Sequence, residues 1–484
     1  MKRNYLIFAT LLLTPLAPND TAAEAGVFHA QGEMTGEVSQ TSAILQSRLT
    51  STAGLADGDV PGTAGIARFE ISEHRDFESS HKTDWLKARA DNNFIVKTKI
   101  AGLRPATQYY FRLIFGPNEN ANQVGDVCSF RTLQREDGTK DVSFVVVTGM
   151  NYMSFHYGTP KNGKRTGNRA YKGADKHLGY PALATMLKMK PDFFVGTGDN
   201  VYYDSHDDRE ATDIQGMRRK WHEQFVQPRF VELFRTVPTY WEKDDHDHRF
   251  NDCDRTGSRP PQSDLGIRIF REQVPVVDPV EEDAKTYRTF RVNRHLQIWL
   301  VEGRDFRSPN KMPDGPGKTL WGAEQIDWLK RTLLASDATW KILISPTPMV
   351  GPDDAYKIDN HTNHRGFRRE GRAFFRWVKQ HKLDQNGFYV ICGDRHWQYH
   401  SIDPIGIEEF SCGALVDANS RLGRSPGDKK STDPNAEIQQ LYTQTEASGG
   451  FLKVTVTEEP TARFEFFDEQ GETLYLTVKR QGED

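Results

Sequence analysis

The chain has 484 residues, a length that predicts two domains rather than one ordinary core. Apolar residues make up 37% of the sequence and aromatic residues 11%, which favours a globular protein and excludes a disordered or fibrous one. The formal net charge of -4 argues against nucleic-acid specificity and offers no polybasic membrane anchor.

The first 25 residues have the pattern of an export signal. Lys2 and Arg3 precede an apolar run from Tyr5 to Leu13, and small residues continue to Ala25. This run is too short to span a bilayer, so we expect cleavage after Ala25 and a secreted or periplasmic protein without a stable membrane anchor. Four cysteines in an exported protein allow up to two disulfides in three pairings, and the sequence leaves their state open. These cysteines are Cys128, Cys253, Cys392 and Cys412.

Residues 26–134 predict a small all-β domain. Short runs such as Ala67–Ile71 and Phe94–Ile100 alternate between two faces, as strands do, and Gly, Asp and Asn separate them. The Leu-x-Pro-x-Thr-x-Tyr pattern from Leu103 to Tyr109 resembles the end of a fibronectin type III-like sandwich, a fold that carries many functions. The polar residues Gln134–Lys140 are the predicted linker to the next domain.

From residue 141 to residue 484, strands and helices alternate. This order predicts an α/β domain with a layered core, in which helices flank central β-sheets. Val142–Thr148 is expected to be a buried strand. Helical segments are also expected within residues 213–237, where Pro228 must break them. The clearest predicted helices are Pro181–Met189, Ala323–Ala335 and Phe367–His381.

The end of the chain returns to strands. Phe451–Val456 and Ala462–Phe467 alternate cleanly, and we expect them to form an antiparallel edge or a second sheet. Two segments rich in Gly, Pro and Asp, Ser308–Lys318 and Gly413–Asp433, are predicted to be surface loops near the functional site.

Three predicted strands run into acidic residues or histidines. Phe193–Thr197 leads to Asp199, Val237–Trp241 leads to Asp244 and the residues up to Asp247, and Phe388–Cys392 leads to Asp394. Because strand ends of an open sheet meet at one edge, we expect a common site there. Carboxylate, phenol and imidazole groups together suit hard divalent or trivalent cations. The ligand candidates are Asp199, Tyr202, Asp245, Asp394 and His396.

These residue types point to phosphoryl chemistry. A shared Asp bridges two ions about 3.5–4 Å apart, and such a pair clamps the attacking and leaving oxygens and supplies hydroxide near neutral pH. His246 follows a ligand candidate, so we expect it to protonate or stabilise the leaving oxygen. Asn151 and Asn200 are candidate substrate contacts.

Taken singly, each signal has a plainer interpretation. Gly-Asp-Asn after a strand is often only a turn, residues 244–247 would suit a solvated acidic loop, and His396 would suit a core histidine. Arg304 would suit an ion pair with Asp305 or Asp247. The occurrence of three such strand ends in one chain favours the site.

The ordered set of motifs resembles a known family. Gly-Asp-x-x-Tyr at 198–202, Asp-Asp-His-Asp at 244–247 and Gly-Asp-x-His at 393–396 are similar to those of the alkaline phosphatase D (PhoD-like) metallophosphatases. Glu302–Arg307 is similar to that family's Asp-Thr-Arg-x-x-Arg segment. The resemblance spans nearly the whole mature chain, because the family also places a β domain before its metallophosphatase core.

The resemblance implies roles for individual residues. Asp199 would bridge two metals, Tyr202 and His396 would hold the first, Asp245 and Asp394 would hold the second, and Arg304 would face the phosphate. It also implies calcium and/or iron as cofactors and hydrolysis of phosphomonoesters and phosphodiesters, on small-molecule or polymeric substrates.

Two positions depart from the family pattern. Gly149 stands where the family usually has a cysteine, and Glu302 replaces an aspartate. For the first metal, two alternatives are open: the carbonyl oxygen of Asn151 takes the place of the thiolate, or the ion binds weakly. The expected function is an exported metal-dependent phosphoesterase, on monoesters or on diesters. The alternative is a catalytically impaired metal- or phosphate-binding protein on the same scaffold.

Overall fold

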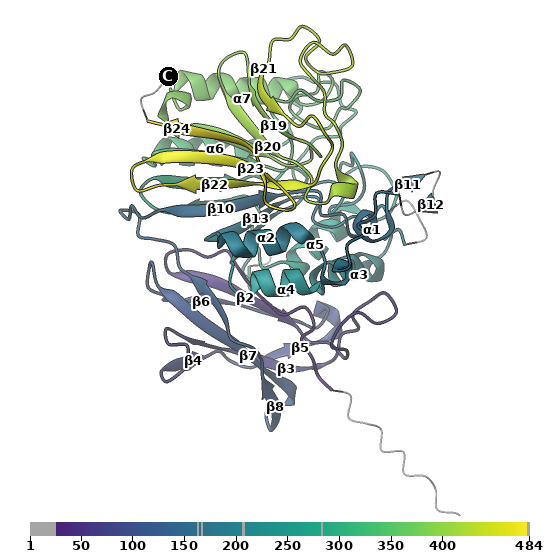
Figure 1. Ribbon diagram of the computed structural model, residues 1–484, viewed down its shortest axis with the longest axis vertical. Coiled ribbons are helices and arrows are strands. Elements are labelled where there is room, and N and C mark those ends of the chain that lie inside the picture. The colour runs from purple at the N-terminus through teal and green to yellow at the C-terminus, as the bar shows by residue number, and fades with distance from the viewer. Residues whose placement is uncertain (1–25, 162–163, 166–167, 206–208, 282–283, 482–484) are drawn as a thin grey trace, which may run out of the picture.

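The computed structural model describes residues 26–161, 164–165, 168–205, 209–281 and 284–481 (Figure 1). The predicted export signal, residues 1–25, lies outside the described residues. Within the described ranges, no helix has both the length and the apolar character needed to cross a membrane.

Two β-sheets stacked face to face form the centre of the molecule. The first sheet has the strand order β24 (Thr473–Arg480), β23 (Thr461–Asp468), β22 (Gly450–Val456), β10 (Val142–Val147), β13 (Phe193–Thr197), β14 (Thr239–Glu242), β1 (Glu33–Gly36), β2 (Ser42–Arg48) and β6 (Ile95–Ala101). The second has the order β15 (Arg288–Arg291), β16 (Leu296–Leu300), β17 (Trp340–Ser345), β18 (Phe388–Cys392), β20 (Glu408–Cys412), β19 (Gln398–Ile402) and β21 (Gln439–Thr443). Buried apolar side chains of both sheets, such as Val146, Val195 and Ile342, pack together between them.

Helices cover the outer faces of both sheets. Figure 1 shows α6 and α7 beyond the second sheet and α1 to α5 along the first, and a separate apolar cluster lies under each group. The confirmed arrangement is therefore helix, sheet, sheet, helix. The helices are α1 (Tyr152–Tyr157), α2 (Pro181–Met189), α3 (Ile214–Phe225), α4 (Pro228–Phe234), α5 (Ser263–Gln273), α6 (Ala323–Ala335) and α7 (Arg368–Gln380). Shorter elements are the pair β11 (Pro160–Lys161) and β12 (Lys164–Arg165) and the 3-10 turns η1 (Ala90–Asn92), η2 (Lys176–Leu178), η3 (Asp384–Asn386) and η4 (Asp417–Asn419).

The predicted helices agree closely with the observed ones. Both α2 and α6 have the predicted bounds, and Pro228 separates α3 from α4 by standing at the first position of α4. Proline is favourable there because the first turn needs no backbone N–H from it. Helix α5 was not predicted, and the strands at the end of the chain form the antiparallel edge of the first sheet.

The N-terminal sandwich is continuous with the main sheet. Its second sheet contains β4 (Ser80–Lys82), β3 (Gly65–Ser72), β7 (Gln108–Asn118) and β8 (Ala121–Val124), with β5 (Leu86–Ala88) and β9 (Cys128–Arg131) paired to it. Its own core includes Leu45, Phe69 and Phe111. Strand β1 pairs in parallel with β14 through Gly36 and Thr239, so the sandwich extends the first sheet of the layered core.

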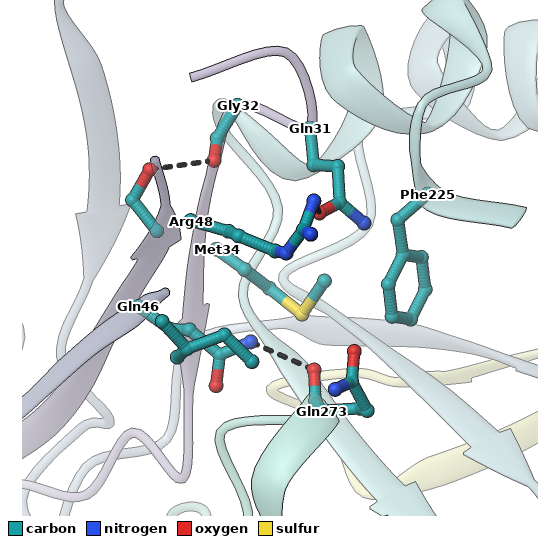
Figure 2. A pocket seen from close by; sticks show the side chains of 9 residues that line it. Gln31, Gly32, Met34, Gln46, Arg48, Phe225 and Gln273 are labelled. Carbon is teal, nitrogen blue, oxygen red and sulfur yellow. Dashed lines mark hydrogen bonds between the residues drawn. The ribbon is translucent and has the colours of Figure 1, made fainter. Parts of the chain in front are cut away.

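Polar contacts also join the sandwich to α3 and α5. Figure 2 shows the junction, a small cavity between β1, β2 and the ends of these helices. Gln46 Nε2 donates to the carbonyl of Gln273, the last residue of α5, at 2.7 Å, while Arg218 of α3 donates to the carbonyl of Asp91 at 3.0 Å. Among the described residues, which include all four cysteines, no disulfide forms, and each cysteine is a buried free thiol.

Candidate metal centre

Two predicted ligands lie on strained turns at strand ends. Asp199 follows β13 and Asp394 follows β18, with backbone φ angles of 53° and 56°. Few residues other than glycine adopt this left-handed region, and such strain is concentrated at functional sites. The preceding glycines have no room for a side chain, since a Cβ would lie 2.5 Å from Asp244 Cβ at Gly198 and 2.4 Å from the Thr197 carbonyl oxygen at Gly393. The strand ends therefore approach one another closely enough for their carboxylates to meet.

Asp199, Tyr202 and His396 converge although nearly 200 residues separate the first from the last. Asp199 Oδ2 accepts a hydrogen bond from the Tyr202 hydroxyl at 2.9 Å and lies 3.1 Å from His396 Nε2. The Tyr202 oxygen lies 3.3 Å from the same nitrogen. Burial would raise the pKa of Asp199, but the charges of His246 and His396 and the hydrogen bond from His396 lower it. The three side chains surround one point with oxygen and nitrogen donors.

Asp245 reaches the same region from the end of β14. Ligand atoms of Asp199, Asp245 and His246 all lie within 4.8 Å of one another. Asp394, the remaining predicted ligand, has Arg395 bound to its carboxylate and Lys357 Nζ 3.8 Å from Oδ1, and it is in neither of the two groups of possible ligand atoms found among the described residues. Burial would raise the pKa of Asp394, but the charges of Arg395 and Lys357 hold it far below its usual range. The structure thus brings together Asp199, Tyr202, Asp245 and His396, whereas the Asp394 carboxylate is paired with Arg395 and Lys357.

His246 is held by an aspartate that the sequence analysis did not assign. Its Nδ1 lies 2.6 Å from Asp204 Oδ1, and its ring packs against Tyr202 with centroids 4.2 Å apart. Burial would lower the pKa of His246, but the carboxylates of Asp204, Asp245 and Asp199 raise it well above the ordinary value. The imidazole is therefore suited to donate a proton. Asp204 is the last residue of the segment that starts at Phe193 and contains Asp199 and Tyr202, and this position could have marked it as a site residue in the sequence.

A second group of carboxylates adjoins the first. Ligand atoms of Asp245, Asp252 and Asp359 lie within 4.8 Å of one another. Asp359 is fully buried, and neither of its carboxylate oxygens has a hydrogen-bond partner among the described residues, although Arg304 lies 3.7 Å from Oδ2. Sequence analysis missed Asp252 and Asp359. The signal for Asp359 was the density of Asp, Asn and His between residues 353 and 364.

The donor set fits divalent cations. Asp199 Oδ1 and Asp244 Oδ2 are also buried without a hydrogen-bond partner in the described part of the chain. Buried carboxylate oxygens without partners are costly, and cations remove that cost. Neither carboxylate group includes a cysteine, so the donors are oxygen and imidazole, which hard divalent cations prefer.

Arg304 is engaged differently from the prediction. Its side chain is fully buried, with Nε and an Nη on Asp244 Oδ1 at 2.6 and 2.5 Å and the other Nη donating to the Cys253 carbonyl. In this structure the guanidinium balances the charge of Asp244. Asp305, one of the two partners considered from the sequence, pairs with Lys243 instead. A contact between Arg304 and phosphate stays a prediction.

The two asparagines proposed as substrate contacts form hydrogen bonds within the protein in this structure. Asn151 Oδ1 caps α1 by accepting from Ser154 N at 2.8 Å, so one lone pair of this oxygen is used within the fold. Asn200 is fully buried, and its amide donates to Asp247 and to the Glu242 carbonyl. A substrate contact by Asn200 Nδ2 would require these bonds to break, whereas Oδ1 is buried without a hydrogen-bond partner in the described part of the chain.

Another asparagine touches the ligands. Asn419, at the end of η4, donates from Nδ2 to the Tyr202 oxygen at 2.7 Å. It was not singled out in the sequence, although it lies in the segment 413–433 that was expected near the site.

Comparison with known proteins gives a consistent result. The family model for the PhoD-like phosphatase matches residues 165–464, and that for the PhoD-like phosphatase N-terminal domain matches residues 16–134. Alkaline phosphatase D of Bacillus subtilis is 20% identical over 468 residues, covering 88% of this chain and 75% of its own. A solved structure of PhoD superposes with a TM-score of 0.70 at 18% identity, covering 96% of this chain and 95% of its own. Purple acid phosphatase PPD1 from yellow lupin (Lupinus luteus) superposes with a TM-score of 0.61 at 12% identity, covering 94% and 74%.

Proposed function

The chain belongs to the PhoD-like phosphatase family and is a phosphoric ester hydrolase, and on this premise we propose that it acts through two cations held between the ends of β13, β14 and β18. The observation that carries the proposal is the meeting of Asp199, Tyr202, Asp245 and His396 beside buried carboxylate oxygens without partners. A site built only for packing would not leave such oxygens unsatisfied.

The proposed roles follow from position. Asp199 contacts Tyr202 and His396 and also lies in one group with Asp245, and we propose that it would be shared by both ions, with Tyr202 and His396 as ligands of one of them. Asp245 and Asp394 would hold the other ion, and Asp252 and Asp359 extend this side. The family implies divalent metal ions, and we propose calcium, iron or both. When bound, such a pair supplies hydroxide near neutral pH and neutralises charge on the phosphate oxygens.

The chain's own acid completes the reaction. His246, fixed by Asp204, donates its proton to the departing ester oxygen, which otherwise leaves as a high-energy alkoxide. Arg304 holds Asp244 beside Asp245 and so preserves the spacing of the carboxylates. The substrates are phosphate esters, on small molecules or polymers, and we propose that both monoesters and diesters enter.

Metal analysis and activity assays of three variants test this proposal. Elemental analysis of protein never exposed to chelator should find about two ions per chain. Asp199→Ala should lower hydrolysis of an aryl phosphate monoester by at least about 100-fold, and His246→Ala should do the same for an alkyl phosphate, whose leaving oxygen needs a proton. Asp264→Ala, on the exposed face of α5, is the matched control and should keep full activity. Wild-type rates in both site variants would refute the assignment. A protein that holds the ions without turning over mono- or diesters would instead be the impaired binding protein.

Export is a separate part of the proposal. Its support is the basic start, short apolar run and small residues in the sequence before residue 26. Expression of the full chain in a bacterial host, followed by N-terminal sequencing of the protein outside the cytoplasm, should give a mature chain that begins after Ala25. Retention of the uncleaved chain in the cytoplasm would contradict export and leave the catalytic proposal intact.

A further inference from the structure

We propose that Asn419 is a positioning residue of the cation site, which fixes the phenol oxygen of Tyr202 in the direction that a bound cation needs. The inference rests on the proposed function, because it assumes that Tyr202 is a ligand. Asn419 comes from the segment after β20, while Tyr202 follows β13, so the contact joins the two stacked sheets at their common edge.

The orientation of the Asn419 amide is fixed by its surroundings. Its Nδ2 lies 2.7 Å from the Tyr202 oxygen and 3.2 Å from the carbonyl oxygen of Gly149. A carbonyl oxygen accepts hydrogen bonds and never donates, so the amide group facing it must be the NH2 end. Its Oδ1 faces Asn151 Nδ2 at 3.5 Å, which agrees with this orientation. Asn419 therefore donates a hydrogen bond to Tyr202.

This donor determines how the phenol oxygen is used. Tyr202 donates its own proton to Asp199 and accepts from Asn419, while His396 lies 3.3 Å away. The bond from Asn419 thus occupies one lone pair of the phenol oxygen, and the phenol proton that a bound cation would replace points toward Asp199. Hydrogen bonds of this kind to ligand atoms orient them and tune the ion they hold.

Gly149 makes the position available to Asn419. Its φ is 66°, and an added Cβ would lie 2.9 Å from Ala414 Cβ and 3.3 Å from Asn419 Nδ2. The space beside β10 that a side chain at Gly149 would take is therefore filled by Ala414 and by the amide. The possible ligand atoms near Tyr202 are its own oxygen, Asp199 oxygen and His396 nitrogen, and no described thiol contacts them.

The segment that carries Asn419 is anchored independently of Tyr202. Arg169 donates to the carbonyl and the hydroxyl of Ser420, and the Asp417 backbone N–H donates to Glu469. Removing the Asn419 amide should therefore leave the segment in place. Ser420→Ala provides a matched control beside Asn419, because it removes the hydroxyl contact with Arg169, keeps the bond from Arg169 to the Ser420 carbonyl and leaves Tyr202 untouched.

The test is a double-mutant cycle read by cation binding. Full-length wild type, Asn419→Ala, Tyr202→Phe, the double variant and Ser420→Ala are stripped with chelator and titrated with Mn²⁺ in a calorimeter. We expect Asn419→Ala to weaken one ion about tenfold in the wild-type background. In the Tyr202→Phe background the same change should alter the dissociation constant less than about twofold, because the shared oxygen is absent. Ser420→Ala should bind as wild type does.

Several outcomes would overturn the inference. Wild-type affinity in Asn419→Ala would show that the amide does nothing for the ion. An equal loss in both backgrounds would assign Asn419 a general structural role instead. Asn419→Leu, of nearly the same size, keeps the test valid if the alanine variant loses stability. If wild-type protein bound none of Mn²⁺, Ca²⁺ and Fe²⁺, the proposed function would fail together with the inference, whereas loss of the amide effect alone would leave that function standing.

Discussion

Asp204 and His246 form a hydrogen-bonded pair, with 2.6 Å between Asp204 Oδ1 and His246 Nδ1, at the wall of the candidate metal centre. Asp204 also accepts from the backbone N–H of Asn251 at 2.8 Å and is buried, so its carboxylate is fixed on both sides. A histidine held through Nδ1 presents Nε2 outward in a defined direction. This pairing is why we assign proton donation to His246.

The first prediction concerns this proton. Asp204→Asn and His246→Ala should slow hydrolysis of alkyl phosphates, whose leaving groups need a proton, by at least about 100-fold. The loss on a 4-nitrophenyl ester should be clearly smaller, because that leaving group departs without protonation. Steady-state kcat on the two esters measures the difference. Equal losses on both would mean that the pair serves structure or metal binding instead.

The strand-end ligands could be predicted because each is local in the sequence. Asp199, Asp245 and Asp394 follow buried strands, and parallel pairing of β13 with β14 brings the first two to one edge. Asp394 follows β18 of the second sheet, so the expectation of a single sheet edge was wrong for this residue, whose approach depends on the stacking of the two sheets. The same local logic predicted α2 and α6, whose apolar spacing and N-terminal residues lie within a few residues of one another.

What depends on distant partners could not be predicted. The pairing of β1 with β14 joins residues about 200 positions apart, and no short pattern records it. Arg304 could have paired with Asp305 or Asp247, and only the packed structure selects Asp244. Asn419 belongs to no recognisable sequence motif. It matters only because its Nδ2 lies 2.7 Å from the Tyr202 oxygen.

The second prediction concerns Asp359. Because neither oxygen has a hydrogen-bond partner in the described structure, Asp359→Asn should stabilise the cation-free protein by about 1–3 kcal/mol. The same variant should gain less stability from added Ca²⁺ or Mn²⁺, since a ligand oxygen is lost. Urea unfolding with and without the ion measures both effects. Asp403→Asn, which removes the partner of Arg372 away from the site, is the control and should destabilise both forms alike. A less stable cation-free Asp359→Asn would contradict the prediction.

The third prediction separates backbone strain from crowding at the site. Gly102 and Gly198 have similar φ angles of 76° and 78°. Only Gly198 is crowded, because a Cβ added there would lie 2.5 Å from Asp244 Cβ, whereas at Gly102 no described atom lies within 4 Å of the same position. Gly102→Ala should cost about 1 kcal/mol from backbone strain alone. Gly198→Ala should cost about 1–3 kcal/mol more and lower activity, because the carboxylates around Asp244 must move. Chemical denaturation and kcat test this, and equal costs in the two variants would refute it.

The fourth prediction concerns a buried acid beneath η4. Glu469 is 6% exposed and accepts from the Asp417 backbone N–H at 3.0 Å. Burial raises the pKa of Glu469 to about 7, with further upward contributions from Asp417 and Asp468, against downward ones from that N–H and from Arg229. The folded protein therefore prefers the protonated acid, while the unfolded chain ionises near the ordinary value of 4.5.

The stabilising contribution of this proton is complete below about pH 4.5 and is lost as pH rises through about 7. Glu469→Gln mimics the protonated form and keeps an acceptor for Asp417, so its stability should not fall in this way. Between pH 5 and pH 8, wild type should lose up to about 3 kcal/mol relative to the variant. Urea unfolding at several pH values measures the difference, with Glu459→Gln, exposed in the turn before β23, as control. A difference between wild type and Glu469→Gln that stays constant over this range would show that Glu469 is already ionised in the fold.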